Sequence, residues 1–215
     1  MLDNIPYLPY VLSAFMGIGL AAATGFRVFL PMFAVSLASY MGWIPMNESF
    51  QWLAGLPVLI TTGIATVVEI MAYYIPFVDH LLDTMSIPLA TIAGSVMFAS
   101  QFADVGTFPQ WALALIAGGG TAAAISSGFA GTRAASTATT GGLGNSVVAT
   151  TETAGAGIMS VLAMAAPIIA FIATIILVIA VLFLGRKLWR KFKGFNSNKP
   201  AKIIDVEAVD RKHLE

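Results

Sequence analysis

The amino-acid sequence predicts an all-α membrane protein, a polytopic helix bundle in which some helices are broken or re-entrant. Three observations predict this class: 58% of the 215 residues are hydrophobic, only 10% are charged, and the apolar residues gather in long segments. The mean hydropathy is +0.85. A soluble domain carries roughly a quarter charged residues, so this composition cannot cover a water-exposed surface. We therefore expect a lipid bilayer around the chain.

The charged residues are distributed unevenly. Nine of the eleven Lys and Arg residues lie in 186–215, whereas seven of the eleven acids lie in 1–185. We therefore divide the chain into a transmembrane bundle, 1–185, and a basic juxtamembrane segment with a flexible cytoplasmic tail, 186–215. Positive residues beside a span stay in the cytoplasm, so the basic cluster is interpreted as a topology anchor or a site for anionic lipid. Nucleic-acid binding is not expected, because the positive charge is confined to this short segment.

The apolar segments predict five main passes, with the N-terminus outside. The first stretch, residues 8–43, is too long for one span and barely enough for two, because a bilayer core needs about 20 apolar residues in a helix. We expect it to break at residues 24–27, ahead of Pro31, where helix propensity falls and a proline removes a backbone hydrogen bond. The remaining spans are expected at residues 53–75, 87–102, 109–130 and 155–185.

Two segments differ from the predicted spans. Residues 77–85 place apolar residues on one side and polar residues on the other at helical spacing, which predicts a short amphipathic helix along the membrane surface. Residues 131–153 are rich in threonine and glycine and carry only two charges, which predicts a non-helical segment. Such backbone is tolerated at membrane depth where it is buried in protein or lines a watery cavity.

The chain also carries a faint internal repeat. Residues 17–27 and 118–133 both run from glycines through three alanines to Gly-x-Arg. A duplication and a chance similarity between alanine-rich helices are both open. A duplication would give two inverted repeats, at about residues 8–85 and 109–185, and proteins built in this way commonly bind substrate where the repeats meet. The arginine that ends each stretch would then converge on one site.

The main candidate site uses the two cations of the membrane body, Arg27 and Arg133. An arginine inside the hydrocarbon costs about 2.5–3.5 kcal/mol and cannot lose its proton, so its charge needs compensation. One interpretation is that the two arginines bind a small anion or an anionic, phosphate-bearing lipid head group, because a guanidinium fits carboxylate and phosphate. The alternatives are internal ion pairs with Glu69, Asp104 or Glu152, and plain exposure at the membrane surface. In the first interpretation, hydroxyls and backbone N–H groups would complete the site, supplied by Ser136, Thr137, Thr139, Thr140, Gly141, Gly142 and Asn145.

Acidic residues and one histidine form a second candidate site, which would couple or conduct a cation or a proton. Asp79, His80 and Asp83 share a helix face at one-turn spacing, and histidine titrates near neutral pH. Glu69 and Glu152 would join them. The polar side of an interfacial helix is the plainer interpretation of the same residues. No metal site is expected, since this group alone lacks a fourth protein ligand.

Catalytic signatures are absent from the sequence. It contains no Gly-x-Ser-x-Gly, no His-Glu-x-x-His, no P-loop pattern and no cysteine. We therefore expect neither an enzyme nor a bound cofactor. Three function classes remain: a transporter or channel for an anion, a cation or proton pathway lined by carboxylates, and a non-transporting scaffold that acts through its cytoplasmic tail. The sequence leaves the oligomeric state open, and both a monomer and a homo-oligomer are compatible with it.

Three strings of the sequence resemble those of a bacterial membrane family catalogued as domain of unknown function 4126. They lie at residues 21–31, 78–83 and 135–145, and the last, with Ser-Thr-Ala-Thr-Thr-Gly-Gly-Leu-Gly-Asn, is the most specific. The resemblance covers roughly residues 10–180. It implies a multi-pass protein of the bacterial inner membrane, and it implies no assigned chemistry.

Overall fold

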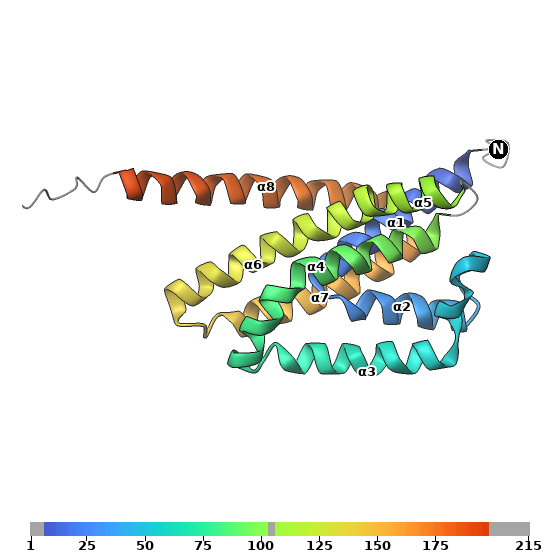
Figure 1. Ribbon diagram of the computed structural model, residues 1–215, viewed down its shortest axis with the longest axis horizontal. Coiled ribbons are helices and arrows are strands. Elements are labelled where there is room, and N and C mark those ends of the chain that lie inside the picture. The colour runs from blue at the N-terminus through green and yellow to red at the C-terminus, as the bar shows by residue number, and fades with distance from the viewer. Residues whose placement is uncertain (1–6, 103–105, 198–215) are drawn as a thin grey trace, which may run out of the picture. The chain divides into compact units, whose positions relative to one another are not determined.

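The computed structural model describes residues 7–102 and 106–197, and these are mostly helical (Figure 1). The chain divides into two compact units, Met1–Leu182 and Phe183–Glu215. The first unit holds the helix bundle that follows. The second unit, where it is described, is the end of the C-terminal helix.

The first half of the chain forms two pairs of helices around a short 3-10 helix. Two residues, Arg27 and Val28, separate the first pair, and the 3-10 helix meets the following helix at a bend of 60°. A proline stands in the first turn of the helices that begin at Leu8, Leu56 and Pro76, where its missing N–H is not needed. In chain order these elements are α1 (Leu8–Phe26), α2 (Phe29–Tyr40), η1 (Glu48–Ala54), α3 (Leu56–Ala72) and α4 (Pro76–Gln101).

The second half begins with one long rod made of three consecutive elements. The middle element is π-helical, and the rod as a whole runs over Thr107–Thr140. Ala166 alone separates the last two helices, because Pro167 cannot donate the backbone hydrogen bond that would continue the first of them. In chain order these elements are α5 (Thr107–Leu113), η2 (Ala114–Gly119), α6 (Gly120–Thr140), α7 (Asn145–Ala165) and α8 (Pro167–Ser197).

Five helices among the described residues are long and apolar enough to cross a bilayer, and the bent pair of η1 and α3 raises this number to six. The protein is therefore a multi-pass α-helical membrane protein, as its sequence predicts. The inverted repeat stays a prediction. The five helices are Leu8–Phe26, Leu81–Gln101, Thr107–Thr140, Asn145–Ala165 and Pro167–Lys187.

Within the first unit, α1 packs against α4, α6 and α7 (Figure 1). Residues 19–25 of this helix are buried, and Leu20 and the three alanines that follow it have no exposed surface. Small residues let membrane helices approach closely. A Cβ atom on Gly94 of α4 would lie only 2.5 Å from the Cβ of Ala122 of α6, so these two helices pack almost backbone to backbone. This close packing fixes the helices that position the candidate site.

The structure differs from the predicted segmentation at residues 77–85. These residues form no separate surface helix, since α4 continues from Pro76 to Gln101 with Pro88 inside it. Membrane helices tolerate an internal proline because hydroxyl side chains and neighbouring helices replace the lost backbone hydrogen bonds. Ser86 donates its hydroxyl to the carbonyl of Asp83 in the turn before Pro88. The span predicted at 87–102 is present, but it begins earlier, at Leu81, and ends at Gln101.

The structure also differs at residues 131–153, which are helical except for 141–144. Threonine hydroxyls in this segment donate to backbone carbonyls one turn earlier, as Thr139 does to Ala135 (2.9 Å), so the polar side chains are satisfied within their own helices. Gly141 ends α6 with a φ of 64°, the left-handed conformation that glycine adopts without strain. The expected irregular segment is therefore a tight turn between two helices.

Candidate functional site

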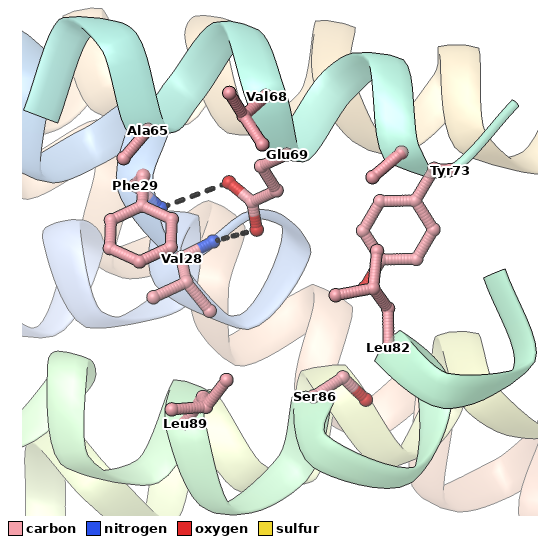
Figure 2. Close-up of a pocket in the computed structure, with 10 residues that line it drawn as sticks. Val28, Phe29, Ala65, Val68, Glu69, Tyr73, Leu82, Ser86 and Leu89 are labelled. Carbon is pink, nitrogen blue, oxygen red and sulfur yellow. Dashed lines mark hydrogen bonds between the residues drawn. The ribbon is translucent and has the colours of Figure 1, made fainter. Parts of the chain in front are cut away.

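Arg27 occupies the break between α1 and α2. Its backbone is extended (φ −143°, ψ 133°), and only 1% of the residue is exposed. A helix that begins here has N–H groups without an acceptor inside the helix. Glu69 of α3 supplies the acceptors: its two carboxylate oxygens accept the N–H groups of Val28 (2.9 Å) and Phe29 (3.0 Å) (Figure 2). Because a negative charge also suits a helix N-terminus, Glu69 stabilises the break.

The guanidinium of Arg27 is held mainly by oxygens of α7. Its Nη2 donates to the carbonyl of Ala149 (2.8 Å), and its Nε donates to Oγ1 of Thr153 (3.1 Å). The same Nη2 lies 3.7 Å from Oε2 of Glu152, at ion-pair distance. Nη1 is buried and has no hydrogen-bond partner among the described residues. Arg27 therefore keeps unused donor capacity.

Arg133 lies on α6 and is 3% exposed. Its Nη2 pairs with Oε2 of Glu152 on α7, and its Nη1 pairs with Oδ1 of Asp83 on α4. The side chain of Glu152 has no exposed surface, whereas that of Asp83 is 21% exposed. Arg133 thus joins three helices, and one of its two acidic partners is partly accessible.

Tyr73 packs against both guanidinium groups. It follows the last residue of α3, and its ring centroid lies 3.9 Å from Cζ of Arg27 and 4.2 Å from Cζ of Arg133. A cation is attracted to the negative face of an aromatic ring, and this one ring serves two cations that repel each other. Tyr73 and Glu152 therefore hold the two arginines together.

These contacts define what we call the charge cluster, namely Arg27, Arg133, Asp83 and Glu152. Its formal charge is zero, because two cations face two acids. One oxygen, Oε2 of Glu152, lies against both guanidinium groups. The other oxygen, Oε1, is buried and has no hydrogen-bond partner among the described residues. A carboxylate between two arginines is also the arrangement by which proteins bind anionic ligands, and in this conformation an internal acid takes that place.

A pocket of about 170 Å³ lies between α3, α4 and the start of α2 (Figure 2). Its walls are mostly apolar, and Glu69 and Tyr73 line it from α3 and the residue that follows. Leu82, Ser86 and Leu89 line it from α4. Tyr73 therefore belongs both to the wall of this pocket and to the surroundings of the charge cluster.

The structure brings together two of the nine residues predicted to bind an anion, Arg27 and Arg133. The other seven lie at the turn between α6 and α7, where they serve mainly that turn. Thr140 donates to the carbonyl of Ser136 (2.8 Å), and Nδ2 of Asn145 donates to the hydroxyl of Thr137 (3.2 Å). Asn145 is buried, whereas the hydroxyl-bearing residues before it are partly or fully exposed. The remaining members of this group are Thr139, Gly141 and Gly142.

Three of the five residues predicted for ion or proton coupling lie in the same region as the arginines. Asp83 and Glu152 belong to the charge cluster, and Glu69 caps α2 beside it. The side chains of Asp79 and His80 lie outside the described residues, as does Asp104. Members of both candidate sites therefore lie in one region, and in this conformation Arg27 and Arg133 form internal ion pairs, which is one of the alternatives that the sequence left open.

Sequence reasoning missed Tyr73 and Thr153. Tyr73 lies four residues after Glu69, which places both on one face of α3, and Thr153 follows Glu152 directly. A search for aromatic residues at helical spacing from the membrane acids would have found Tyr73, whereas Thr153 does not lie at that spacing from any of them. The carbonyl of Ala149 carries no such signal, because a backbone acceptor has no side-chain signature.

The fold and the charge cluster together define a class of protein: a multi-pass α-helical membrane protein whose spans bury two arginines with their acidic partners. The chain belongs to the family described as "Domain of unknown function (DUF4126)", whose model matches residues 14–187. This range includes every residue of the charge cluster. No curated protein and no solved structure matches the chain.

Proposed function

We propose that the protein is a small transporter or channel of the bacterial inner membrane, and that it carries a small anion bound by Arg27 and Arg133. The observation that supports this proposal is the position of Glu152, whose Oε2 lies against both guanidinium groups. A site that holds the carboxylate of a side chain has the charge and the donors to hold the carboxylate or phosphate of a substrate. Transport then requires that the substrate take the place of Glu152.

The cost of burying charges favours a functional role for the cluster. Replacing a buried ion pair by well-packed apolar residues is often neutral or stabilising. If stability alone mattered, small residues would suffice to join these helices, as Gly94 and Ala122 do between α4 and α6. Charged residues inside membrane proteins commonly mark the path of a substrate or ion.

The helix break at Arg27 supports the same proposal. Transporters commonly bind their substrate where a helix is interrupted inside the membrane, because helix ends and unpaired backbone groups meet there. The pocket beside Tyr73, at about 170 Å³, is smaller than the 300–1,000 Å³ that drug-sized ligands occupy. A small anion therefore fits this region better than a bulky one.

The orientation in the membrane belongs to the proposal as well. We place the C-terminus in the cytoplasm, because positively charged residues follow the apolar part of α8. The chain has no cysteine, so a single Lys187→Cys substitution can be labelled selectively. We expect a membrane-impermeant maleimide to reach this position only after the cell membrane is opened. The charged residues in question are Arg186, Lys187, Arg190, Lys191 and Lys193.

Anion uptake into proteoliposomes that hold the full-length protein tests the proposal, with labelled chloride and phosphate as probes. Arg27→Met is expected to lower uptake about thirtyfold or more, because truncating a buried charge partner costs at least 2 kcal/mol. Arg27→Lys should keep part of the activity, since it keeps the charge and loses the planar fork. Arg186→Gln removes an exposed cation far along α8 and is the matched control. Full uptake by folded Arg27→Met protein would overturn the proposal.

The acids support a second candidate, a proton or cation pathway through Glu69, Asp83 and Glu152. These three acids outnumber the two buried arginines, so the five side chains carry a formal charge of −1. Uptake of labelled chloride and of labelled rubidium into the same proteoliposomes separates the two candidates. Chloride enters if the arginines bind the transported ion, whereas rubidium, or protons without chloride, enter if the carboxylates do.

A further inference from the structure

We infer that Glu152 carries a proton across the membrane together with the anion, so that one monovalent anion and one proton move in each cycle. This inference rests on the proposed function, because it explains how a substrate anion can replace an acid that already occupies the site. Glu152 then has a role of its own. Its ionised carboxylate competes with the substrate for the two arginines, and its protonated form releases them.

The geometry singles out Glu152 among the acids of the site. Its Oε2 contacts both arginines, whereas Asp83 contacts Arg133 and Glu69 binds the backbone of α2. The side chain of Glu152 is fully buried, and its Oε1 has no hydrogen-bond partner among the described residues. A proton on Oε1 would leave Oε2 a neutral acceptor, which binds the two guanidinium groups far more weakly.

The ionisable groups around Glu152 come from four places: the break between α1 and α2, the end of α3, α4 and α6. Arg27 faces it from the break between α1 and α2, and Arg133 faces it from α6. Tyr73, which follows α3, packs on both arginines, Glu69 of α3 binds the backbone next to Arg27, and Asp83 pairs with Arg133 from α4. These are the groups that the described residues contribute to the electrostatics of the site.

Charge balance determines what moves with the anion. The charge cluster is neutral while Glu152 is ionised, so a monovalent anion that bound to it would leave a charge of −1 in a buried site. An uncompensated buried charge costs several kcal/mol. Protonation of Glu152 raises the cluster to +1, and one monovalent anion restores it to zero. Glu69 keeps its two backbone N–H partners in both states.

Each cycle then balances in protons and charge without any covalent step. A proton from the water on one side binds the carboxylate of Glu152, and the anion binds the two released guanidinium groups. On the other side the anion leaves, the proton returns to water, and Glu152 pairs again with Arg27 and Arg133. Because the two charges cancel, the membrane potential does not drive the cycle.

The test measures accumulation of chloride and of phosphate in proteoliposomes held at zero membrane potential by potassium and valinomycin. With an acidic exterior, one proton for each monovalent anion gives an inside-to-outside ratio of about tenfold for each pH unit. A pH indicator inside the vesicles should report one proton entering with each chloride ion. Glu152→Gln cannot carry a proton and is expected to reduce the ratio to one, whereas Glu152→Asp keeps a carboxyl group and should still accumulate the anion.

Glu48→Gln is the matched control, because it neutralises an exposed acid of η1 and should leave the tenfold ratio unchanged. Tenfold accumulation by Glu152→Gln would overturn the inference. If wild-type uptake depends on Arg27 but shows no proton movement, the inference fails while the proposed function stands. If no uptake depends on Arg27, both fail. Should Glu152→Gln not fold, the indicator measurement on the wild-type protein decides alone.

Discussion

The two buried arginines are held in opposite ways. Arg133 lies inside a continuous helix and pairs with two carboxylates, Glu152 and Asp83. Arg27 lies at a helix break, and its hydrogen bonds go to neutral oxygens of Ala149 and Thr153. The charge of Arg133 is thus compensated directly, whereas that of Arg27 depends on a longer ion pair with Glu152.

This difference indicates that the two arginines have different roles, one structural and one in ligand binding. Arg133 joins α4, α6 and α7 and has the larger structural role. Arg27 keeps a buried Nη1 without a partner among the described residues, so it has capacity for a ligand. The following predictions test whether the two arginines differ in this way, and they concern the free energy of unfolding in detergent, measured by titration with sodium dodecyl sulfate.

The largest effect is expected for Arg133→Met. Removing one partner of a buried ion pair costs about 3–5 kcal/mol, and this substitution leaves both Glu152 and Asp83 without Arg133. Arg27→Met should cost less, about 1–3 kcal/mol, because Glu152 keeps Arg133 and the lost hydrogen bonds end on neutral oxygens. Adding Glu152→Gln to Arg133→Met should restore part of the stability. Equal losses of stability for the two arginine variants would contradict the larger structural role of Arg133.

Gly25→Ala is expected to destabilise the protein by about 1–3 kcal/mol through overpacking. The added Cβ would lie 2.7 Å from Cβ of Ile125 and 2.9 Å from the carbonyl oxygen of Ala122, so α6 must move away from the end of α1. Gly157→Ala on α7 is the matched control, because nothing lies within 4 Å of its added Cβ. A loss as small as that of the control would mean that the break at Arg27 is not held by this contact.

Glu69→Gln should cost about 1–2 kcal/mol, since it weakens the cap of α2 and removes a negative charge from a helix N-terminus. We expect this loss of stability to be coupled to substitution of Arg27 and not of Arg133, because Glu69 binds the backbone just after Arg27. Combining Glu69→Gln with Arg27→Met should therefore give less than the sum of the two losses, while its combination with Arg133→Met should be closer to additive. The reverse pattern would link Glu69 to Arg133 instead.

The smallest effect is expected for Thr153→Val, about 1 kcal/mol, because it removes one hydrogen-bond acceptor from Arg27 without changing the shape of the side chain. Thr151→Val, two residues earlier, is the matched control. Its hydroxyl is exposed and donates to the carbonyl of Val147 within α7. If both variants lose the same stability, the hydrogen bond to Nε of Arg27 contributes nothing.

The sequence predicted the break at Arg27 because the physical causes are local. Residues 24–27 lower helix propensity, and Pro31 restricts the start of the next helix. The convergence of Arg27 and Arg133 was expected only if the faint repeat is a true duplication, and the duplication stays a prediction. Glu152 was named among the acids that could pair with the arginines, whereas Asp83 was not, because it lies 50 positions before Arg133 and no local pattern encodes a contact between distant helices.

In the threonine-rich segment, residues 131–153, the prediction from local composition was wrong. Its composition pointed to irregular backbone, yet the chain there is helical, because threonine hydroxyls bond to the preceding turn. Composition alone does not distinguish a hydroxyl that is available to bind a ligand from one that is hydrogen-bonded to a carbonyl of its own helix. Pro88 posed the same difficulty for α4, since a proline that ends a soluble helix is tolerated within a membrane.

The rod of α5, η2 and α6 has 34 residues, and at 1.5 Å for each residue it is about 50 Å long. The hydrocarbon core of a bilayer is only about 30 Å thick. The rod must therefore tilt steeply or project into the head-group layer, and either response depends on how thick the surrounding lipid is. Acyl-chain length is thus an independent control over the depth at which Arg133 sits. Vesicles of short-chain and long-chain lipid give a way to shift the whole site relative to water without changing a single atom of the protein.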